Sequence, residues 1–230
     1  MITILTWLWS QSGGRENYTA EHVNIWAAMV RRNVSVPHRV ACVTDMPKGI
    51  DPAVEIIAPP RDFEAVRISS WGPAQPQCLR RLAMFRPDAA GIFGERFVSM
   101  DLDVVIGGSL DPLLSSGDDF VMYRGTGKDR PYNGSMIMLA AGARSQVYTK
   151  FTQEGAEAAG QRYVGSDQAW ISHILGRGEK TFGPEHGVVW WGNRLAEPDH
   201  RVMFFPGYPK PWHVPLADPV GPWIRENYRR

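Results

Sequence analysis

The stretch Arg96-Phe97-Val98-Ser99-Met100-Asp101-Leu102-Asp103-Val104-Val105-Ile106 carries two carboxylates, one residue apart, within a mostly apolar segment. It predicts a buried strand that ends at the aspartates. Asp101 and Asp103 then lie on the same side of an extended chain, with Cα atoms roughly 6.5–7 Å apart. Carboxylates at the edge of a core are costly without a cation or hydrogen-bond donor. The pair can hold a hard divalent ion and leave room for a diphosphate; the alternative is two solvated aspartates in a turn.

Composition and charge indicate one globular domain, residues 1–230, without a nucleic-acid partner. The chain has 230 residues, of which 43% are hydrophobic, and a formal net charge of +1. This length and apolar content suffice for one sizeable core, and the balanced charge lacks the basic excess of nucleic-acid-binding proteins. The two cysteines, Cys42 and Cys78, are far apart and show no metal-ligand spacing. We therefore expect reduced thiols in a cytoplasmic protein.

Neither end of the sequence predicts a transmembrane segment. The apolar run Ile2–Trp9 has no basic lead and no cleavage site, and it is too short to cross a bilayer, so it is interpreted as a first strand. The basic tail Arg225–Arg230 is more typical of a frayed terminus than of a membrane contact. A peripheral membrane contact through this tail stays open.

Strands and helices alternate through the first half of the chain. Strands are predicted at Ile2–Leu8, Arg39–Thr44, Val54–Ile57 and Phe97–Met100, and helices from about Thr19 and between Pro76 and Pro87. The alternation predicts an α/β fold with a mainly parallel central sheet flanked by helices. Ligands of such sheets bind at the carboxyl ends of the strands. Asp45, Asp101 and Asp103 all follow strands, so we expect them to open into one crevice.

The second half of the chain is less regular. Strands are predicted at Phe120–Tyr123, Ser135–Ala141, Val188–Trp191 and Val202–Phe205, helices over Arg144–Ala159 and from Asp167, and a polar loop at Gly125, Gly127 and Lys128. Ser166 is a suitable N-cap for the helix from Asp167, and an acidic residue in a first turn favours the helix dipole. These residues therefore have a structural explanation that needs no chemistry.

Four blocks of the sequence, in this order, resemble a known group of enzymes. They are Leu79-Arg80-Arg81-Leu82-Ala83-Met84-Phe85; Met100-Asp101-Leu102-Asp103-Val104-Val105 with Ser109-Leu110-Asp111-Pro112-Leu113; Tyr132-Asn133-Gly134-Ser135-Met136-Ile137-Met138 with Gly165-Ser166-Asp167-Gln168; and Phe204-Phe205-Pro206-Gly207-Tyr208-Pro209-Lys210-Pro211-Trp212. The order resembles the nucleotide-sugar glycosyltransferases of the GT-A fold, in particular glycosyltransferase family 8, which includes glycogenin-like and lipopolysaccharide galactosyltransferase-like enzymes. With their connecting strands, the blocks span most of the chain.

The resemblance implies a function and a set of partners. It implies transfer of a hexose from a UDP-sugar to a glycan or glycolipid acceptor, assisted by Mn²⁺ or Mg²⁺ acting as a Lewis acid at the diphosphate, with the retaining outcome of the family resting on Gln168. Residues 1–103 would form the nucleotide-binding half, and residues 104–230 the half that holds the donor sugar and the acceptor.

The resemblance also implies a role for individual residues. The expected assignments are Asp103 and Asp101 at the metal; Arg81 and Lys210 at the diphosphate; Asp167 and Gln168 as catalytic residues beside the donor sugar; Asn133 at sugar hydroxyls; and Trp7, Trp9, Tyr18 and Asp45 around the nucleobase. Each has an ordinary alternative, since Arg81 and Lys210 could be surface cations and most of the nine tryptophans belong to the core.

One position departs from the family pattern. The family has a metal-binding histidine three residues before the glycine of its last motif, and here that position is Phe204. His213, just past Trp212, is the nearest imidazole and is expected as the substitute metal ligand. Without it, a hard ion would complete its coordination with water, the ion would bind weakly, or the activity would be lost.

Two other classes of function stay open. A sugar nucleotidyltransferase would carry a glycine-rich basic loop after the first strand, which Ser10–Arg15 matches only faintly. A catalytically inactive protein that binds nucleotide sugars or carbohydrate is also consistent with the missing histidine. Product analysis separates the two enzymes, and binding without turnover would select the inactive protein.

Overall fold

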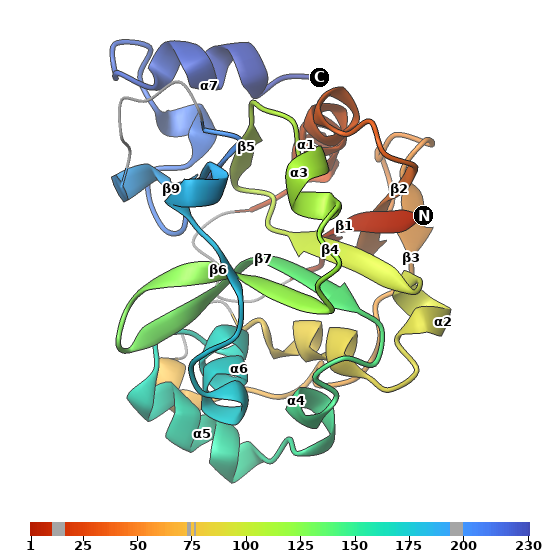
Figure 1. The fold of residues 1–230 in the computed structure, drawn as a ribbon, viewed down its shortest axis with the longest axis vertical. Coiled ribbons are helices and arrows are strands. Elements are labelled where there is room, and N and C mark those ends of the chain that lie inside the picture. Colours follow the sequence, from red (N-terminus) through yellow and green to blue (C-terminus); the bar gives the residue numbers. More distant parts are fainter. Residues whose placement is uncertain (11–16, 73–74, 76, 194–199) are drawn as a thin grey trace.

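A seven-stranded mixed sheet forms the centre of the molecule (Figure 1). The computed structural model describes residues 1–10, 17–72, 75, 77–193 and 200–230. The strands of this sheet are β1 (Ile2–Leu8), β2 (His38–Thr44), β3 (Glu55–Ile57), β4 (Arg96–Met100), β6 (Phe120–Gly127), β7 (Arg130–Ala140) and β8 (Thr181–Phe182), in the order β3-β2-β1-β4-β7-β6-β8. The pairs among β3, β2, β1 and β4 are parallel, as is β6 with β8, whereas β7 is antiparallel to β4 and β6.

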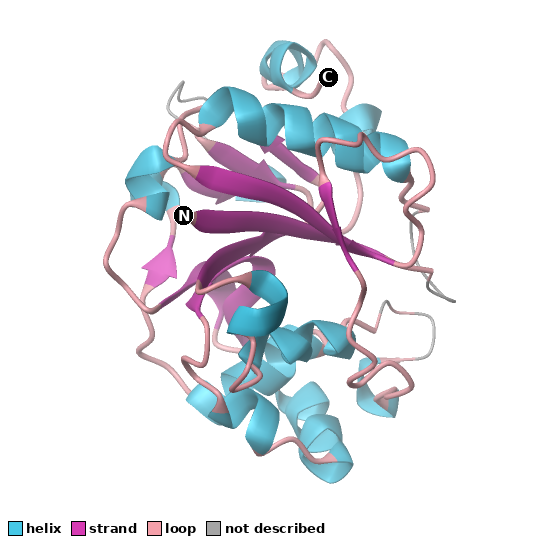
Figure 2. Ribbon diagram, turned by 90° about the vertical axis from the view of Figure 1, so that its right-hand side faces the viewer, coloured by secondary structure: helices cyan, strands magenta, loops and turns pink. Residues whose placement is uncertain are grey.

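Helices cover both faces of this sheet, as Figure 2 shows. The helices and 3-10 turns are α1 (Ala20–Asn33), η1 (Ser69–Trp71), η2 (Leu79–Phe85), α2 (Ala90–Phe93), α3 (Asp111–Leu114), α4 (Gln146–Thr149), α5 (Gln153–Arg162), α6 (Asp167–Leu175), η3 (Pro184–His186), η4 (Trp191–Asn193), η5 (Pro211–His213) and α7 (Gly221–Asn227). Every residue of β1 is buried, because the strand lies between two apolar layers. The predicted α/β fold with helices on a mainly parallel sheet is thus confirmed.

Each face of the sheet has its own hydrophobic core. One core contains side chains of α1, α3 and α7, with Trp26 and Met29 fully buried. The other contains side chains of η2, α2, α4, α5 and α6, with Phe85 and Trp170 at its centre. The sheet joins both halves of the sequence, because β7 pairs with β4 along Arg96 to Met100. Among the residues described, no helix combines the length and apolarity that crossing a membrane requires.

A second, three-stranded sheet lies beside the site region. It consists of β5 (Val104–Ile106), β10 (Val202–Phe204) and β9 (Val188–Trp190), in the order β5-β10-β9. Because β5 begins directly after Asp103, this sheet brings the carboxyl-terminal part of the chain next to the two aspartates. The chain end also returns to α1, where Arg230 pairs with Glu21 and Arg32 donates to the carbonyl of Asn227 at 2.7 Å.

Three element predictions differ in detail from the structure. The single helix predicted over Arg144–Ala159 is two helices, since Thr152 is extended and its Oγ1 accepts a hydrogen bond from Gly155 N to start α5. The segment before Pro87 is a 3-10 helix, and Pro76 lies outside the described residues. The polar loop around Gly125 belongs to the β6–β7 hairpin, because Gly125 approaches the Arg130 carbonyl too closely for any side chain.

Candidate functional site

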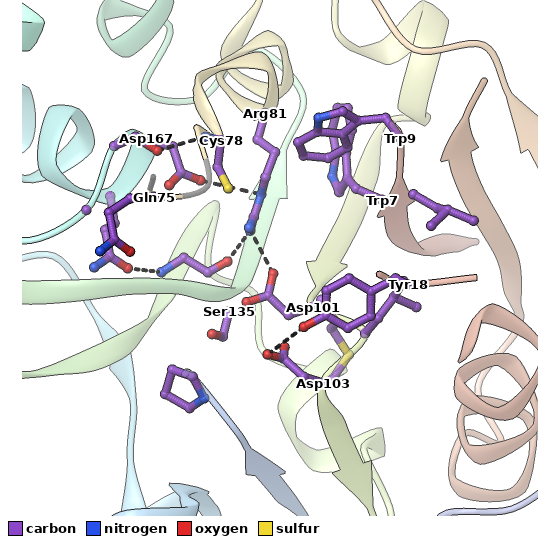
Figure 3. Close-up of a pocket in the computed structure, with 18 of the residues that line it drawn as sticks. Trp7, Trp9, Tyr18, Gln75, Cys78, Arg81, Asp101, Asp103, Ser135 and Asp167 are labelled. Atoms are coloured by element: carbon purple, nitrogen blue, oxygen red, sulfur yellow. Dashed lines mark hydrogen bonds and ion pairs between the residues drawn. The ribbon is translucent and has the colours of Figure 1, made fainter. Parts of the chain in front are cut away.

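A cavity of about 600 Å³ opens at the carboxyl ends of β1 and β4. Ten of the residues singled out in the sequence line it: Trp7, Trp9, Tyr18, Arg81, Asp101, Asp103, Asn133, Asp167, Gln168 and Lys210. They come from β1, η2, β7, α6, the segments after β1, β4 and β10, and the segment before α1, so the fold gathers residues that are far apart in sequence. Figure 3 shows several of them facing the same space.

An irregularity in β7 shapes the floor of the cavity. Ile137 pairs with Met122, but the next pair along β6 is Tyr123 with Asn133, so β7 carries additional residues between them. Such bulges turn the backbone away from its ladder and are frequent beside active sites. The Asn133 side chain accepts a hydrogen bond from Ser135 N at 2.9 Å, and the Ser135 carbonyl accepts one from Asp101 N at 3.0 Å. The bulge thereby fixes the start of the Asp101–Asp103 segment.

The buried guanidinium of Arg81 links three parts of the site. Its Nη1 donates to Asp101 Oδ1 at 2.8 Å, its Nη2 donates to the carbonyl of Gly134, and its Nε lies 3.4 Å from Asp167 Oδ2 (Figure 3). Burial lowers the pKa of Arg81, but the charges of Asp101 and Asp167 outweigh it, and the net pKa is raised. Burial raises the pKa of Asp167, although Arg81 opposes this. Arg81 is therefore a fixed, buried cation at the cavity wall and not the exposed helix arginine that the sequence left open as an alternative.

A second ion pair holds the other aspartate. Lys210 Nζ donates to Asp103 Oδ2, and Tyr18 OH donates to the same oxygen at 3.0 Å. Lys210 Nζ also donates to the carbonyl of Phe205 at 3.1 Å, and only 5% of Lys210 is exposed. Burial and the neighbouring charge of Asp101 raise the pKa of Asp103, Lys210 and Tyr18 oppose this, and the net pKa is raised. Lys210 is thus a buried partner of Asp103 rather than a surface lysine.

Gln168 connects the start of α6 to the bulge. Its Oε1 accepts a hydrogen bond from Gly134 N at 3.0 Å, and its Nε2 donates to the carbonyl of Val164 at 2.8 Å. Ser166 occupies the N-cap position, as predicted, but its hydroxyl accepts a hydrogen bond from Cys78 N at 2.8 Å instead of capping α6. Both side chains therefore tie α6 to neighbouring elements at the cavity wall.

Aromatic side chains form one end of the cavity. The indole of Trp7 donates to Ser99 Oγ at 3.1 Å and meets the ring of Trp9 edge-on, with 5.7 Å between ring centroids. Tyr18 meets Trp212 edge-on at 6.2 Å. Trp7 is 8% exposed, so it contributes mainly as an anchored wall. Trp9 and Tyr18 are more exposed and present ring surface for stacking.

Two residues predicted at the site do not line this cavity. Asp45 lies 3.9 Å from Arg80 Nη1 instead, because Arg80 points away from Arg81 toward the segment after β2. The His213 Nδ1 accepts a hydrogen bond from Lys210 N at 3.4 Å, and its ring packs against Tyr208 with centroids 5.2 Å apart. The one-crevice prediction therefore holds for Asp101 and Asp103 but not for Asp45, and His213 lies outside the described wall.

Sequence inspection missed several residues that line the cavity: Trp71, Gln75, Cys78 and Arg130. Arg130 is the cation among these four residues, and its buried Nε has no hydrogen-bond partner within the part of the chain that the structure describes. Val164 N donates to the Asp129 carbonyl at 2.9 Å, which brings this end of β7 next to the residues before α6. To predict Arg130 at the cavity, one would have needed to know that β6 pairs with β7. The sequence predicted a loop between these strands.

Comparison of sequences identifies no relative. No protein-family model matches the chain, and a search of curated proteins finds no match.

Comparison of structures, in contrast, shows the fold. The galactosyltransferase LgtC in complex with donor and acceptor sugar analogs is 14% identical, with a TM-score of 0.62, over 97% of this chain and 94% of LgtC. The apo form of the glycosyltransferase GlyE from Streptococcus pneumoniae is 10% identical, with a TM-score of 0.57, over 99% of this chain and 64% of GlyE. The bifunctional glycosyltransferase WbbM is 12% identical, with a TM-score of 0.53, and this chain spans about half of it (98% and 51% covered). The chain has the GT-A fold of glycosyltransferases that resemble family 8.

Proposed function

We propose that this protein is a glycosyltransferase that moves a hexose from a UDP-sugar to a glycan or glycolipid acceptor. The observation that supports it best is the pair of buried cations, Arg81 and Lys210, each held by one aspartate of the Asp101–Asp103 motif at the wall of a large cavity. The N–H groups of these two side chains are held at fixed positions, which suits a ligand that carries negative charge at its centre and uncharged groups at both ends. A nucleotide sugar has this distribution of charge.

The proposed reaction needs stabilisation of a leaving diphosphate. The bond between the anomeric carbon and the diphosphate oxygen breaks, and its electron pair stays with the diphosphate. The acceptor hydroxyl oxygen bonds to the anomeric carbon, and its proton passes to the departing diphosphate. Fixed cations such as Arg81 stabilise the charge that develops on the leaving group, because they need no reorganisation during the reaction.

The two ends of the cavity suit the two ends of such a donor. The rings of Trp9 and Tyr18 offer a stacking surface for a nucleobase. At the other end, Asn133, Asp167 and Gln168 supply polar groups for the sugar hydroxyls. LgtC was solved with donor and acceptor sugar analogs, and its fold matches over nearly the whole chain, which supports the same kinds of ligand here.

Product analysis tests this proposal against its alternatives. The chain is incubated with a panel of nucleotide sugars and oligosaccharide or glycolipid acceptors, and separately with sugar 1-phosphates plus UTP. We expect release of UDP with formation of a glycosylated product from the first set. A nucleotide sugar formed from the second set would identify a nucleotidyltransferase, and binding of nucleotide sugars without any product would identify an inactive binding protein.

A matched pair of arginine variants connects activity to the site. Arg81→Gln removes the cation at the cavity wall and is expected to abolish transfer. Arg80→Gln, one residue away, changes a buried arginine that donates to the Pro60 carbonyl at 2.9 Å and is not part of the wall. Transfer that survives in Arg81→Gln would contradict the assignment of the site.

A further inference from the structure

Each of the two carboxylates that could hold a divalent cation in this site is already paired with a side-chain cation through one of its oxygens. Asp103 Oδ2 accepts hydrogen bonds from both Lys210 Nζ and Tyr18 OH, and Asp101 Oδ1 accepts one from Arg81. Within residues 1–10, 17–72, 75, 77–193 and 200–230, no three His, Cys, Asp or Glu side chains are grouped so that they could hold a metal ion. The described residues therefore offer two carboxylates, both already paired with cations, where the family resemblance implies a third, imidazole ligand for Mn²⁺ or Mg²⁺.

The position of the family's histidine is part of the hydrophobic core. Phe204 is fully buried, and its ring packs against Tyr123 with 5.2 Å between centroids. Its backbone pairs with Val104 on one side and Trp190 on the other, in the middle strand of the small sheet. Because Phe204 belongs to this packing, its replacement by a polar ligand would cost stability. His213 does not compensate, since it does not line the cavity and its Nδ1 accepts a hydrogen bond from Lys210 N.

Lys210 has the position and the spare bonding capacity of a substitute cation. An ammonium group has three N–H donors. Asp103 and the Phe205 carbonyl take two of them, and the side chain lies in the cavity wall. Asp103 and Tyr18 act here as positioning residues, because they hold a charge that would otherwise be expelled from a buried site. One N–H remains for a ligand.

We propose that this protein neutralises the diphosphate of its donor with Lys210 and Arg81 and without a divalent cation. This inference rests on the proposed function, since it assigns the charge compensation of that same reaction. Lys210 and Arg81 lie on different segments, after β10 and in η2, and each is fixed by one aspartate of the Asp101–Asp103 motif. The motif that binds the metal in the resembled family thus serves in this chain to hold two side-chain cations.

UDP binding to the unaltered full-length chain provides the first test. Calorimetry in excess EDTA and in excess Mn²⁺ is expected to give dissociation constants within about twofold of each other, a difference well under 1.4 kcal/mol. Binding that occurs only with Mn²⁺ would overturn the inference and leave the proposed function intact. Absence of UDP binding under both conditions would overturn the proposed function as well.

A pair of lysine variants provides the second test. Lys210→Met keeps the length of the side chain but removes the charge, and it is expected to weaken UDP binding in EDTA by at least about tenfold. Lys180→Met is the matched control, because Lys180 pairs with Asp118 at the exposed surface and is not part of the cavity wall. Unchanged binding in Lys210→Met overturns the inference. If Lys210→Met does not fold, the comparison of EDTA with Mn²⁺ on the unaltered chain still decides.

Discussion

Buried charge pairs determine both the shape and the stability of this site at the scale of single residues. Asp103 is 8% exposed and Lys210 is 5% exposed, so each charge depends on the other. Removal of one partner from such a pair costs far more than the pair contributes, because the remaining charge stays buried. Asp103 therefore has a structural role as the counter-ion of Lys210, which a solvated metal ligand would not have.

Replacement of Asp103 by asparagine tests this dependence. We expect Asp103→Asn to lower the free energy of unfolding by about 3 kcal/mol, because the buried ammonium of Lys210 loses the carboxylate with which it is paired. Urea unfolding monitored by fluorescence measures the change. Asp118→Asn is the control, since Asp118 pairs with the exposed Lys180, and its expected cost is small because surface ion pairs contribute little to stability. Equal costs for the two variants would show that Asp103 is not a structural counter-ion.

Gln168 combines a structural bond with a proposed catalytic position. Gln168→Ala removes the acceptor of Gly134 N and is expected to cost about 1–3 kcal/mol of unfolding free energy. If Gln168 also contacts the donor sugar, turnover falls by roughly ten- to a thousandfold while UDP affinity stays nearly unchanged. The control is Gln153→Ala, which removes an exposed hydrogen bond to the Arg67 carbonyl. Turnover equal to that of the control would leave Gln168 with a structural role alone.

At the scale of elements, hydrophobic patterns predicted the strands well and the short helices poorly. The bounds of β1, α1 and α6 follow from apolar spacing and from Thr19 and Asp167 at the helix starts, which are local signals. The bulge in β7 depends on pairing with β6 and β4, and no local pattern indicates it. The same limit applies to the site, since the Lys210–Asp103 pair joins residues 107 positions apart.

The contact between η1 and α5 gives the molecule a specific acid sensitivity. Glu157 accepts hydrogen bonds from Ser69 N at 2.7 Å and Ser70 N at 2.9 Å, next to Trp71 at the cavity wall. These bonds lower the pKa of Glu157 from 4.5 to about 2. A carboxyl group with a lowered pKa contributes stability above its unfolded pKa and loses it as the pH falls through the folded one. The contribution is therefore complete above about pH 5 and lost by about pH 2.

Thermal unfolding of Glu157→Gln across this pH range checks the expectation. The difference in Tm between the unaltered chain and Glu157→Gln should be largest near neutral pH and shrink toward zero as the pH approaches about 2. Asp103 and Asp167, with raised pKa values, act in the opposite direction, since their contribution is present at low pH and lost as the pH rises. Both carboxyl groups are present in the unaltered chain and in Glu157→Gln, so their contributions cancel in the Tm difference. A Tm difference independent of pH would contradict the assignment.

At the scale of the whole molecule, the site is assembled from the beginning, middle and end of the chain. Tyr18 precedes α1, Asp103 follows β4, and Lys210 lies in the segment after β10, whose position is fixed by the small sheet and by Trp212 against His22 at 4.5 Å. A ligand that contacts all three segments binds the folded chain only. Its binding therefore stabilises the entire fold in proportion to its affinity.

Nucleotide-dependent thermal shifts test the proposed donor class at this scale. UDP at about 100 times its dissociation constant adds about 2.7 kcal/mol to the free energy of unfolding, which for a chain of this size corresponds to an increase in Tm of roughly 5–10 °C. ADP at the same concentration is expected to give a smaller shift, because the resembled family uses uridine and the base would lie between Trp9 and Tyr18 at the end of the cavity. Lys210→Met should lose most of the UDP shift, because Lys210 is the proposed cation at the diphosphate. The ADP shift should fall as well, since ADP carries the same diphosphate. Equal shifts with UDP and ADP would contradict the preference for uridine but not the diphosphate site. A UDP shift that is unchanged in Lys210→Met would mean that the diphosphate does not bind at Lys210.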